Sequence, residues 1–186
     1  MISVSGRKWK EKKVNINIAE KIQQENSFSK ILSKLIASRD FDKSEIHLIE
    51  NKLKLTNIFQ NNHDFIESVK ITEDAINNKD NICIIGDYDV DGSAAASLLV
   101  RFFKNSSHPF FFYIPDREKD GYGASKKLLE NLITKKPKLV IMVDCGSTSN
   151  EAINYLNKKN IKSLVIDHHE INKPFPKANV IINPNK

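Results

Sequence analysis

Residues 79–186 carry a pattern of short apolar runs separated by longer amphipathic segments. The runs are rich in β-branched residues and bounded by Gly, Pro, Asn or Asp, which predicts strands; the segments between them predict helices. The predicted strands are residues 82–85, 110–114, 139–143, 163–166 and 180–182, and the predicted helices are residues 93–104, 124–134 and 150–159. Strands alternating with helices form a parallel sheet with helices on both faces. The sequence therefore predicts an α/β domain.

The helix expected at residues 93–104 has Ala, Leu and Phe on nearly all sides, so we expect it to be buried on nearly all sides. Residues 16–78 contain no Pro, and their pattern predicts helices. One stripe has helical spacing: Ile31, Leu32, Leu35 and Ile36. Ser44 is placed to cap a further helix that runs through Leu55. These features predict a helical N-terminal segment, residues 1–78, packed on the α/β domain.

Composition and charge narrow the class of protein. With 186 residues, 40% of them hydrophobic, the chain can form a real core, and its net charge of +6 favours polyanionic partners without specifying one. No apolar run has transmembrane length, and the N-terminus lacks the apolar segment of a signal peptide, so no membrane partner is expected. Cys83 and Cys145 have no redox spacing, which favours the reduced thiols of a cytoplasmic protein.

Three carboxylates alternate where the first predicted strand ends. Asp87, Asp89 and Asp91 occur in the run I-G-D-Y-D-V-D-G. Side chains two residues apart in an extended chain point the same way, so we expect the three to crowd one face. Like charges at this range raise one another's pKa unless a cation lies among them. Hard cations with oxygen ligands are the usual solution in proteins.

Two other interpretations fit parts of this stretch. A calcium loop of the EF-hand type also begins D-x-D-x-D-G, but it requires a carboxylate at its twelfth position and a helix in front. Counted from Asp87, the twelfth residue is Leu98, and the preceding run is strand-like. An EF-hand is therefore disfavoured. A solvated acidic loop stays open on this stretch alone.

Acidic and imidazole side chains also follow the third and fourth predicted strands, residues 139–143 and 163–166. Asp144 follows the third strand, and Asp167, His168 and His169 follow the fourth. A parallel sheet brings the carboxyl ends of its strands to one edge, where ligands bind. Carboxylate together with imidazole suits manganese, iron or zinc, and carboxylate alone suits magnesium. The mixed set favours Mn²⁺, with Mg²⁺ as the alternative.

Four motifs occur in the order D-Y-D-V-D-G, G-Y-G, V-D-C-G and D-H-H. Together they resemble the motifs of the DHH phosphoesterase superfamily. The D-Y-D-x-D-G form, the P-x-R before G-Y-G, the I-N-P-N after D-H-H and the N-terminal G-R-K-W resemble its RecJ branch, the single-strand-specific exonucleases. The resemblance covers most of the chain and is strongest over residues 82–186.

The resemblance implies a metal-dependent phosphodiesterase with two ions, Mn²⁺ or Mg²⁺. It implies degradation of single-stranded DNA in the 5′-to-3′ direction, in repair and recombination, with a repair helicase or single-strand-binding protein as a protein partner. Matched position by position, the metal ligands are Asp89, Asp91, Asp144 and His168. Asp144 is the ligand that would bridge the two ions.

The remaining motif residues match catalytic and substrate-binding positions. His169 matches the second histidine, which lies by the scissile phosphate, and Asp87 matches a motif residue that orients the metal ligands. The positions at the nucleic-acid strand end are Arg117, Gly121, Tyr122 and Gly123. Arg117 is suited to bidentate phosphate contact.

The chain departs from the family in one respect. The family has a further metal-binding Asp several tens of residues after D-H-H, then a second domain, DHHA1, and an OB-fold in the RecJ branch. These parts do not occur in the 186 residues. We therefore expect residues 79–186 to be a DHH catalytic domain truncated on its C-terminal side. By itself the chain is expected to bind divalent metal weakly and to have little exonuclease activity.

Two alternative functions stay open. Other branches of the superfamily act on short oligonucleotides or cyclic dinucleotides, but they tend to carry a His ahead of the Asp pair, where this chain has Ile85. The other alternative is a non-catalytic nucleic-acid-binding fragment. The presence of every expected motif residue within the chain disfavours it.

Overall fold

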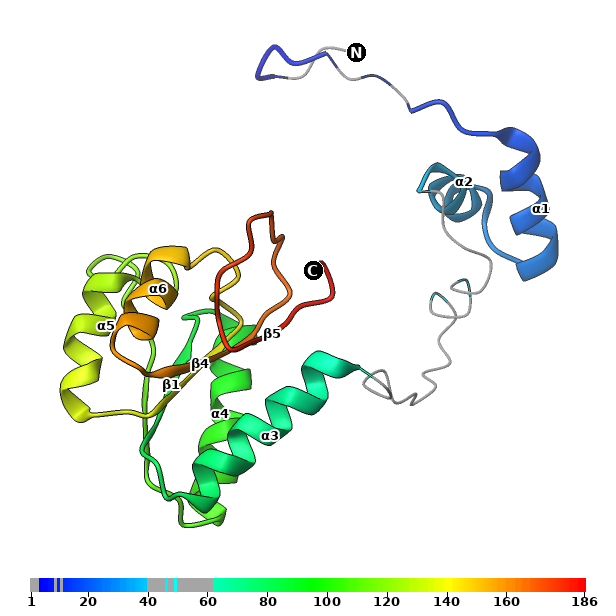
Figure 1. The fold of residues 1–186 in the computed structure, drawn as a ribbon. Coiled ribbons are helices and arrows are strands. Elements are labelled where there is room, and N and C mark those ends of the chain that lie inside the picture. The colour runs from blue at the N-terminus through cyan, green and yellow to red at the C-terminus, as the bar shows by residue number, and fades with distance from the viewer. Residues whose placement is uncertain (1–3, 9, 11, 40–45, 47–48, 50–61) are drawn as a thin grey trace. The chain divides into compact units, whose positions relative to one another are not determined.

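The structure is a computed structural model that describes residues 4–8, 10, 12–39, 46, 49 and 62–186 (Figure 1). The chain forms two compact units, residues 1–57 and 58–186. The sequence analysis instead places the boundary between residues 78 and 79. The difference arises because α3, His63–Asn77, packs against the last strand of the sheet and so belongs to the second unit. The helix expected from Ser44 to Leu55 lies outside the described residues.

In the first unit two helices pack against each other. Helix α1 spans Ile16–Asn26 and α2 spans Lys30–Ser38, and each begins at a polar side chain that accepts a backbone N–H, Asn15 and Ser29 respectively. Their small core contains Ile22, Ile36 and Ile46, with Leu32 beside it. The predicted apolar stripe is therefore only half buried. Its other two members, Ile31 and Leu35, are exposed, because they lie off the face that α2 presents to this core.

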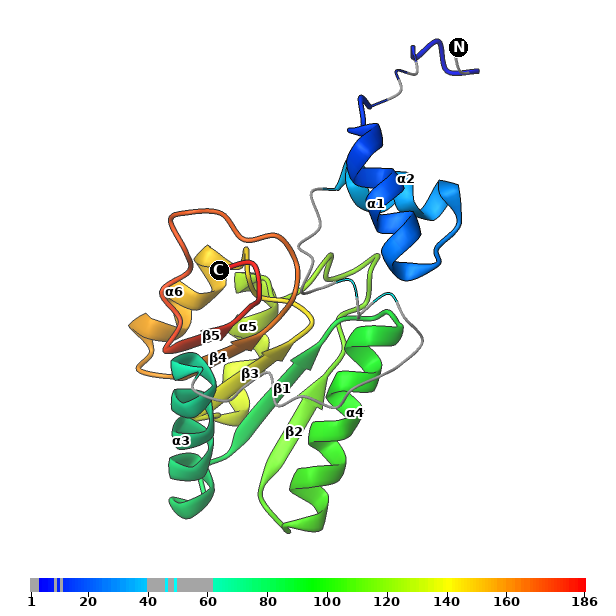
Figure 2. The same cartoon turned by 90° about the vertical axis from the view of Figure 1, so that its right-hand side faces the viewer.

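The second unit is built on a five-stranded sheet. Its strands are β1 (Ile82–Gly86), β2 (Phe110–Tyr113), β3 (Leu139–Val143), β4 (Lys162–Ile166) and β5 (Val180–Ile182). Their order across the sheet is β2-β1-β3-β4-β5, and all neighbours are parallel (Figure 2). The central strands β1 and β3 are buried along their whole length. The predicted α/β fold is confirmed.

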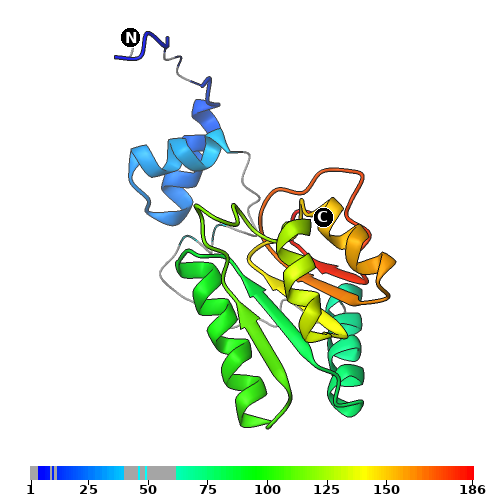
Figure 3. The same ribbon diagram turned by 90° about the vertical axis from the view of Figure 1, so that its left-hand side faces the viewer.

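Helices cover both faces of this sheet. Helices α3 and α4 (Val90–Asn105) lie on one face, where they pack on Ile84 and Ile141 (Figure 2). Helices α5 (Lys126–Leu132) and α6 (Asn150–Lys158) cover the opposite face and pack on Cys83 and Met142 (Figure 3). Alternate residues of each central strand thus enter different cores, as the pleat of a strand requires. A short 3₁₀ helix, Ile133–Lys135, follows α5.

Helix α4 differs from the expectation in two ways. It begins at Val90, three residues earlier than predicted, and the prediction that it is buried on nearly all sides is wrong. Ala96 and Phe103 are buried, whereas Leu98 is 68% exposed and Phe102 is 53% exposed. The reason is that α4 packs on β1 and β2 through a single stripe, which leaves its outer side apolar and accessible.

Across the described parts of the chain, no helix combines the length and the apolar character that a bilayer span requires.

Candidate metal centre

The candidate site lies where the strand connections change direction. From β1 the chain crosses to β2 on one side, whereas β3 on the other side leads on to β4 and β5. In open parallel sheets the crevice outside the carboxyl ends of such strands is the usual ligand site. Asp87 follows β1, Asp144 follows β3, and Asp167 follows β4. The sheet topology therefore brings the predicted motifs to one edge.

The segment after β1 turns directly into α4. Asp87 is only 2% exposed, and Asp89 is the N-cap of α4, where its Oδ1 accepts the N–H of Gly92 at 3.0 Å. A Cβ atom at Gly92 would lie 2.5 Å from the backbone nitrogen of Asp87. Only glycine permits this approach, and it is what folds the first turn of α4 back onto the end of β1.

This turn separates Asp91 from Asp87 and Asp89. Asp91 lies in the first turn of α4 and is exposed. The expectation that Asp87, Asp89 and Asp91 extend from the strand on one face is therefore wrong, because the extended conformation ends before the helix begins at Val90. The N-cap hydrogen bond of Asp89 stabilises the helical alternative.

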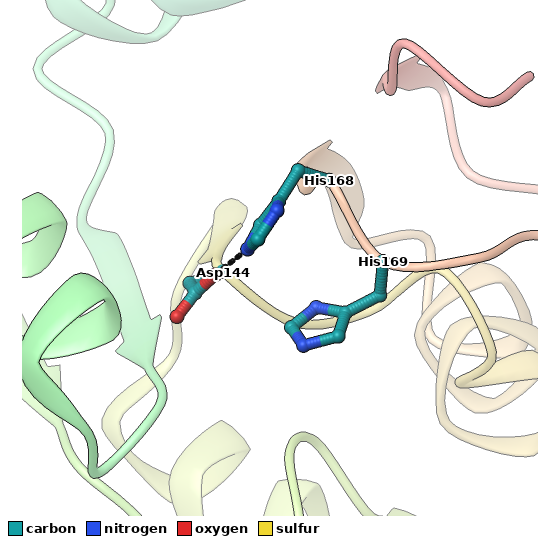
Figure 4. Close-up of side chains that lie close together, drawn as sticks. All are labelled: Asp144, His168 and His169. Atoms are coloured by element: carbon teal, nitrogen blue, oxygen red, sulfur yellow. Dashed lines mark ion pairs between the residues drawn. The ribbon is translucent and has the colours of Figure 1, made fainter. Parts of the chain in front are cut away.

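Asp144 is the centre of the arrangement. It has a left-handed backbone with φ of 60°, and its N–H donates to the carbonyl of Ile166 at 2.9 Å. The carboxylate is buried, and its Oδ1 lies 3.0 Å from Nε2 of His168 (Figure 4). The other oxygen, Oδ2, is buried and has no hydrogen-bond partner among the described residues. A buried carboxylate oxygen without a partner is costly, and a bound cation would remove that cost.

The carboxylates of Asp89 and Asp144 interact directly. Burial raises the pKa of Asp144, and the negative charge of Asp89 raises it further. The pKa of Asp89 is lowered, chiefly by the N–H of Gly92. One carboxyl group thus favours its ionised form while its neighbour favours a proton. A divalent cation can replace that proton and let both groups ionise.

The structure brings the ligand atoms into two overlapping groups. Asp87, Asp89 and Asp144 form one, Asp144, His168 and His169 form the other, and within each group the atoms lie within 4.8 Å of one another. In Figure 4 the rings of both histidines lie beside Asp144. Asp144 is common to both groups. Asp91 is in neither, and its assignment as a metal ligand stays a prediction, as do the roles given to the other motif residues.

Asp167 is a residue to which the sequence analysis gave no role. It is 7% exposed, and its carboxylate accepts from the N–H groups of Ser147 and His168 at 3.0 and 2.8 Å. Its Oδ1 also lies 2.7 Å from Nδ1 of His169. Burial alone would raise the pKa of Asp167, but the hydrogen bonds from His169 and Ser147 outweigh it and lower the pKa to about 2. In the sequence, this role is indicated by the aspartate that begins the D-H-H motif.

The hydrogen bond to Asp167 sets the state of His169. It raises the pKa of His169 above its ordinary value, so the imidazolium form is favoured. It also restricts the ring, because it engages Nδ1. The phenolic oxygen of Tyr122 lies 3.3 Å from Nδ1 and 3.2 Å from Nε2 of His169. His169 is thus an oriented imidazole at the edge of the sheet whose charged form is favoured.

Two asparagines from the end of β5 hold the histidine loop. The side-chain amide of Asn183 donates to the carbonyl of His169 at 2.9 Å, and that of Asn185 donates to the carbonyl of His168 at 2.7 Å. The sequence analysis noted I-N-P-N only as a point of resemblance. The structure shows what it does, since both amides fix the backbone that carries the two imidazoles.

The predicted substrate-binding residues lie on the connection between β2 and α5. Gly121 and Gly123 have positive φ, which produces a tight turn and places Tyr122 beside His169 with ring centroids 5.8 Å apart. The guanidinium of Arg117 lies 5.6 Å from the ring centroid of Tyr88. Arg117 and Tyr122 are both exposed, so a ligand can reach them from solvent.

The donor set fits a divalent cation. It combines three carboxylates and two imidazoles at one strand edge, and one buried carboxylate oxygen lacks a partner within the described residues. Carboxylate together with imidazole suits manganese, iron or zinc. The observation that decides the family is a sequence match. The family model for the DHH family, N-terminal domain, matches residues 81–186.

The chain belongs to the DHH family. Among curated proteins, the single-stranded-DNA-specific exonuclease RecJ of Haemophilus influenzae is 33% identical over 120 residues, which is 64% of this chain and 21% of that protein. RecJ of Bacillus subtilis is 24% identical over 182 residues, 97% of this chain and 23% of the relative. This DHH-family chain thus spans about a fifth of the length of the curated relatives it matches.

Solved structures of similar proteins support the family assignment. A crystal structure of exonuclease RecJ bound to manganese is 28% identical to this chain, with a TM-score of 0.59. The match covers 63% of this chain and 30% of the RecJ chain. A structure of RecJ from Thermus thermophilus in complex with Mn²⁺ is 20% identical to this chain, with a TM-score of 0.60. The match covers 91% of this chain and 24% of the RecJ chain. Because its sequence identity is only 20%, the second structure supports the fold alone. The chain is thus similar in sequence and fold to exonucleases of the RecJ type.

Proposed function

We propose that this protein is a metal-dependent phosphodiesterase of the RecJ type that degrades single-stranded DNA from its 5′ end in repair and recombination. The observation that carries the proposal is the overlap of two ligand groups on Asp144, whose Oδ2 is buried without a partner in the described part of the chain. The names of the similar exonucleases support single-stranded DNA as the substrate.

The proposed cofactor is manganese, or magnesium, as two ions. Asp87, Asp89, Asp144 and His168 would hold them, with Asp144 shared, and Asp91 is a further proposed ligand from the adjoining turn of α4. When bound, the ions supply Lewis-acid stabilisation of charge on the phosphoryl oxygens. The solved RecJ structure bound to manganese that is 28% identical to this chain supports this choice of metal.

The chain's own residues supply positioning and a proton. His169 is held by Asp167, which raises the pKa of the imidazole and favours its protonated form, so its Nε2–H can stabilise a phosphoryl oxygen or protonate the leaving oxygen. Asp167 stays ionised near neutral pH, because its own pKa is about 2. Arg117, with Tyr122 in the turn formed by Gly121 and Gly123, is proposed to bind the strand end by bidentate phosphate contact.

The proposed setting is the cytoplasm, with single-stranded DNA as the main partner and a repair helicase or single-strand-binding protein as candidate protein partners. The net charge of +6 favours a polyanionic substrate. The free thiols of Cys83 and Cys145 accord with a reducing compartment.

The test measures nucleotide release from single-stranded DNA by the natural gene product, with manganese present. We expect mononucleotides from a 5′-labelled strand, and we expect both Asp89→Ala and Asp144→Ala to abolish their release. Duplex DNA, short oligonucleotides and cyclic dinucleotides serve as comparison substrates. Hydrolysis of cyclic dinucleotides in preference to single strands would assign the protein to another branch of the family, and activity that survives both substitutions would remove these residues from the site.

A further inference from the structure

Helix α2 has a second, accessible stripe on the side away from its small core. The members of this stripe, at helical spacing, are Ile31, Lys34, Leu35 and Ser38. Its two apolar side chains, Ile31 and Leu35, are 75% and 54% exposed, whereas Ile36 on the opposite side of the helix is buried. One apolar face of α2 thus packs in the first unit, and a second one is open to solvent.

The segment that leads into α1, residues 12–15, lies beside this stripe. The ammonium of Lys12 donates a hydrogen bond to the carbonyl of Ser38 at the end of α2. Two hollows of about 300 and 290 Å³ lie along the segment and the stripe. They adjoin, because Lys12, Val14 and Lys34 line both. Together they form one depression, which we call the α2 groove.

The α2 groove is lined by aliphatic side chains and by lysines. The aliphatic residues are Val14, Ile16, Ile31 and Leu35, and the lysines are Lys12, Lys13 and Lys34. Among the described residues, no carboxylate lines the groove or forms an ion pair with these lysines, whereas Lys21 on α1 pairs with Glu25 at 3.8 Å. Residues 1–57 contain twelve Lys and Arg against seven Asp and Glu, so they carry +5 of the net charge of +6. The positive charge of the groove is therefore left for a ligand to neutralise.

The lining narrows the chemistry of that ligand. Single-stranded nucleic acid binds by phosphate contacts together with stacking of its bases on aromatic rings, and the groove as the structure describes it presents only aliphatic side chains. A lipid surface takes an apolar helix face that protrudes, whereas these side chains line a depression. An acidic peptide carries both of the required groups, carboxylates for the lysines and apolar side chains for the hollows.

We propose that the α2 groove binds an acidic segment of a partner protein. Two apolar side chains of the partner occupy the two hollows, and its carboxylates lie beside Lys12, Lys13 and Lys34. The inference does not depend on the proposed function, because the first unit carries none of the candidate metal ligands. It adds a protein-docking surface to a chain whose proposed chemistry lies in the second unit. Ion pairs at an exposed surface are screened by salt, so this docking is salt-sensitive.

The test uses the 186-residue chain and a short labelled peptide in which Asp and Glu surround two Leu one helical turn apart. Fluorescence anisotropy measures the affinity. One comparison peptide has Ser in place of the two Leu, and another has Lys in place of Asp and Glu. We expect both to bind at least about tenfold more weakly than the first peptide, since each lacks one of the two complementary features. Binding of the first peptide should weaken as salt is added.

Substitutions then locate the binding surface. Lys34→Glu and Leu35→Ser change exposed side chains that line the groove, and each should weaken peptide binding about fivefold or more. The matched controls are Lys70→Glu on α3, which makes the same change in net charge, and Ile18→Ser on α1, which removes a similarly exposed aliphatic side chain. Neither residue lines the groove, so both controls should bind as the wild type does. Circular dichroism checks that all four variants are folded.

Oligothymidylate and vesicles of anionic phosphatidylglycerol are tested with the same proteins. Loss of oligothymidylate or vesicle binding in both Lys34→Glu and Leu35→Ser, without peptide binding by the wild type, would assign the groove to nucleic acid or to lipid and overturn the inference. Equal affinity for the acidic and the basic peptide would also overturn it. Absence of peptide binding together with a lower unfolding free energy in Leu35→Ser would mean that another part of the chain fills the groove, with the same consequence. Exonuclease activity, present or absent, does not bear on these outcomes.

Discussion

The Nδ1 atom of His169 lies 2.7 Å from Oδ1 of Asp167, a carboxylate that is almost fully enclosed by protein. Each group changes the other. The carboxylate raises the pKa of His169, and the imidazole helps to lower the pKa of Asp167 to about 2 against the effect of burial. The pair favours the charged form of an oriented imidazole near the carboxylates of Asp87 and Asp144.

We expect Asp167→Asn to lower the pKa of His169, because an amide carries no charge to stabilise the imidazolium. The measurement is an NMR titration of the histidine ring resonances in both proteins. The control is Asp120→Asn, which removes a carboxylate with a lowered pKa that contacts Tyr113 and the N–H of Asp116 rather than a histidine. A His169 titration curve that does not move in Asp167→Asn would contradict the assigned hydrogen bond.

The same residue predicts a pH dependence of stability. The pKa of Asp167 is about 2 in the folded protein, against about 3.9 in an unfolded chain, so its contribution to stability is present above about pH 3.9 and is lost as the pH falls toward 2. His169 stays charged across this window because its pKa is raised. Wild type and Asp167→Asn should therefore differ in unfolding free energy at about pH 5, and the difference should shrink at about pH 2.5. Denaturant titrations at the two pH values measure it, and a constant difference is the contrary result.

Manganese affinity should depend on Asp144 and not on a nearby exposed carboxylate. Asp144→Ala removes the residue common to both ligand groups and should weaken binding about tenfold or more, as loss of ligand support commonly does. Asp116→Ala is the control, because that side chain is exposed and bonds to the backbone of its own loop. Calorimetric titration with manganese compares them. Equal affinities would remove Asp144 from the site.

Arg117→Lys should cost activity although the charge is kept. The planar guanidinium can bind a phosphate through two N–H groups, and an ammonium cannot, so turnover of single-stranded DNA at low substrate concentration should fall about tenfold. Lys119→Arg, in the same loop and also exposed, should have little effect. The assay uses the gene product as the cell makes it. Unchanged turnover in Arg117→Lys would place this residue outside the substrate-binding site.

Gly92→Ala should disturb both the fold and metal binding. Its Cβ would meet the backbone and Cβ of Asp87 at 2.5–2.6 Å, so the first turn of α4 must move away from the end of β1. We expect a loss of about 1–3 kcal/mol in unfolding free energy, the usual cost of overpacking, together with weaker manganese binding. Ser97→Ala, at an exposed position of the same helix, should affect neither. Thermal unfolding and calorimetry provide the two measurements.

Much of the fold could be predicted because it depends on local patterns. Short apolar runs alternating with helical segments suffice to indicate a parallel sheet, and the motif residues at Asp87, Asp144 and His168 fall at strand ends because polar residues terminate buried strands. Sequence spacing also placed them at one edge, since parallel strands share the direction of their carboxyl ends. The sequence by itself thus determined the fold class, the edge that carries the site and its candidate residues.

Tertiary structure decided how those residues meet. Asp91 departs from the other carboxylates because α4 starts early, which depends on the close approach of Gly92 to the end of β1. Asp167 becomes an orienting residue only through its burial and its contact with His169. The outer side of α4 stays exposed because packing on a sheet buries one stripe of a helix whatever its composition. Such features depend on distances between segments far apart in the chain, and no local pattern of residues encodes those distances.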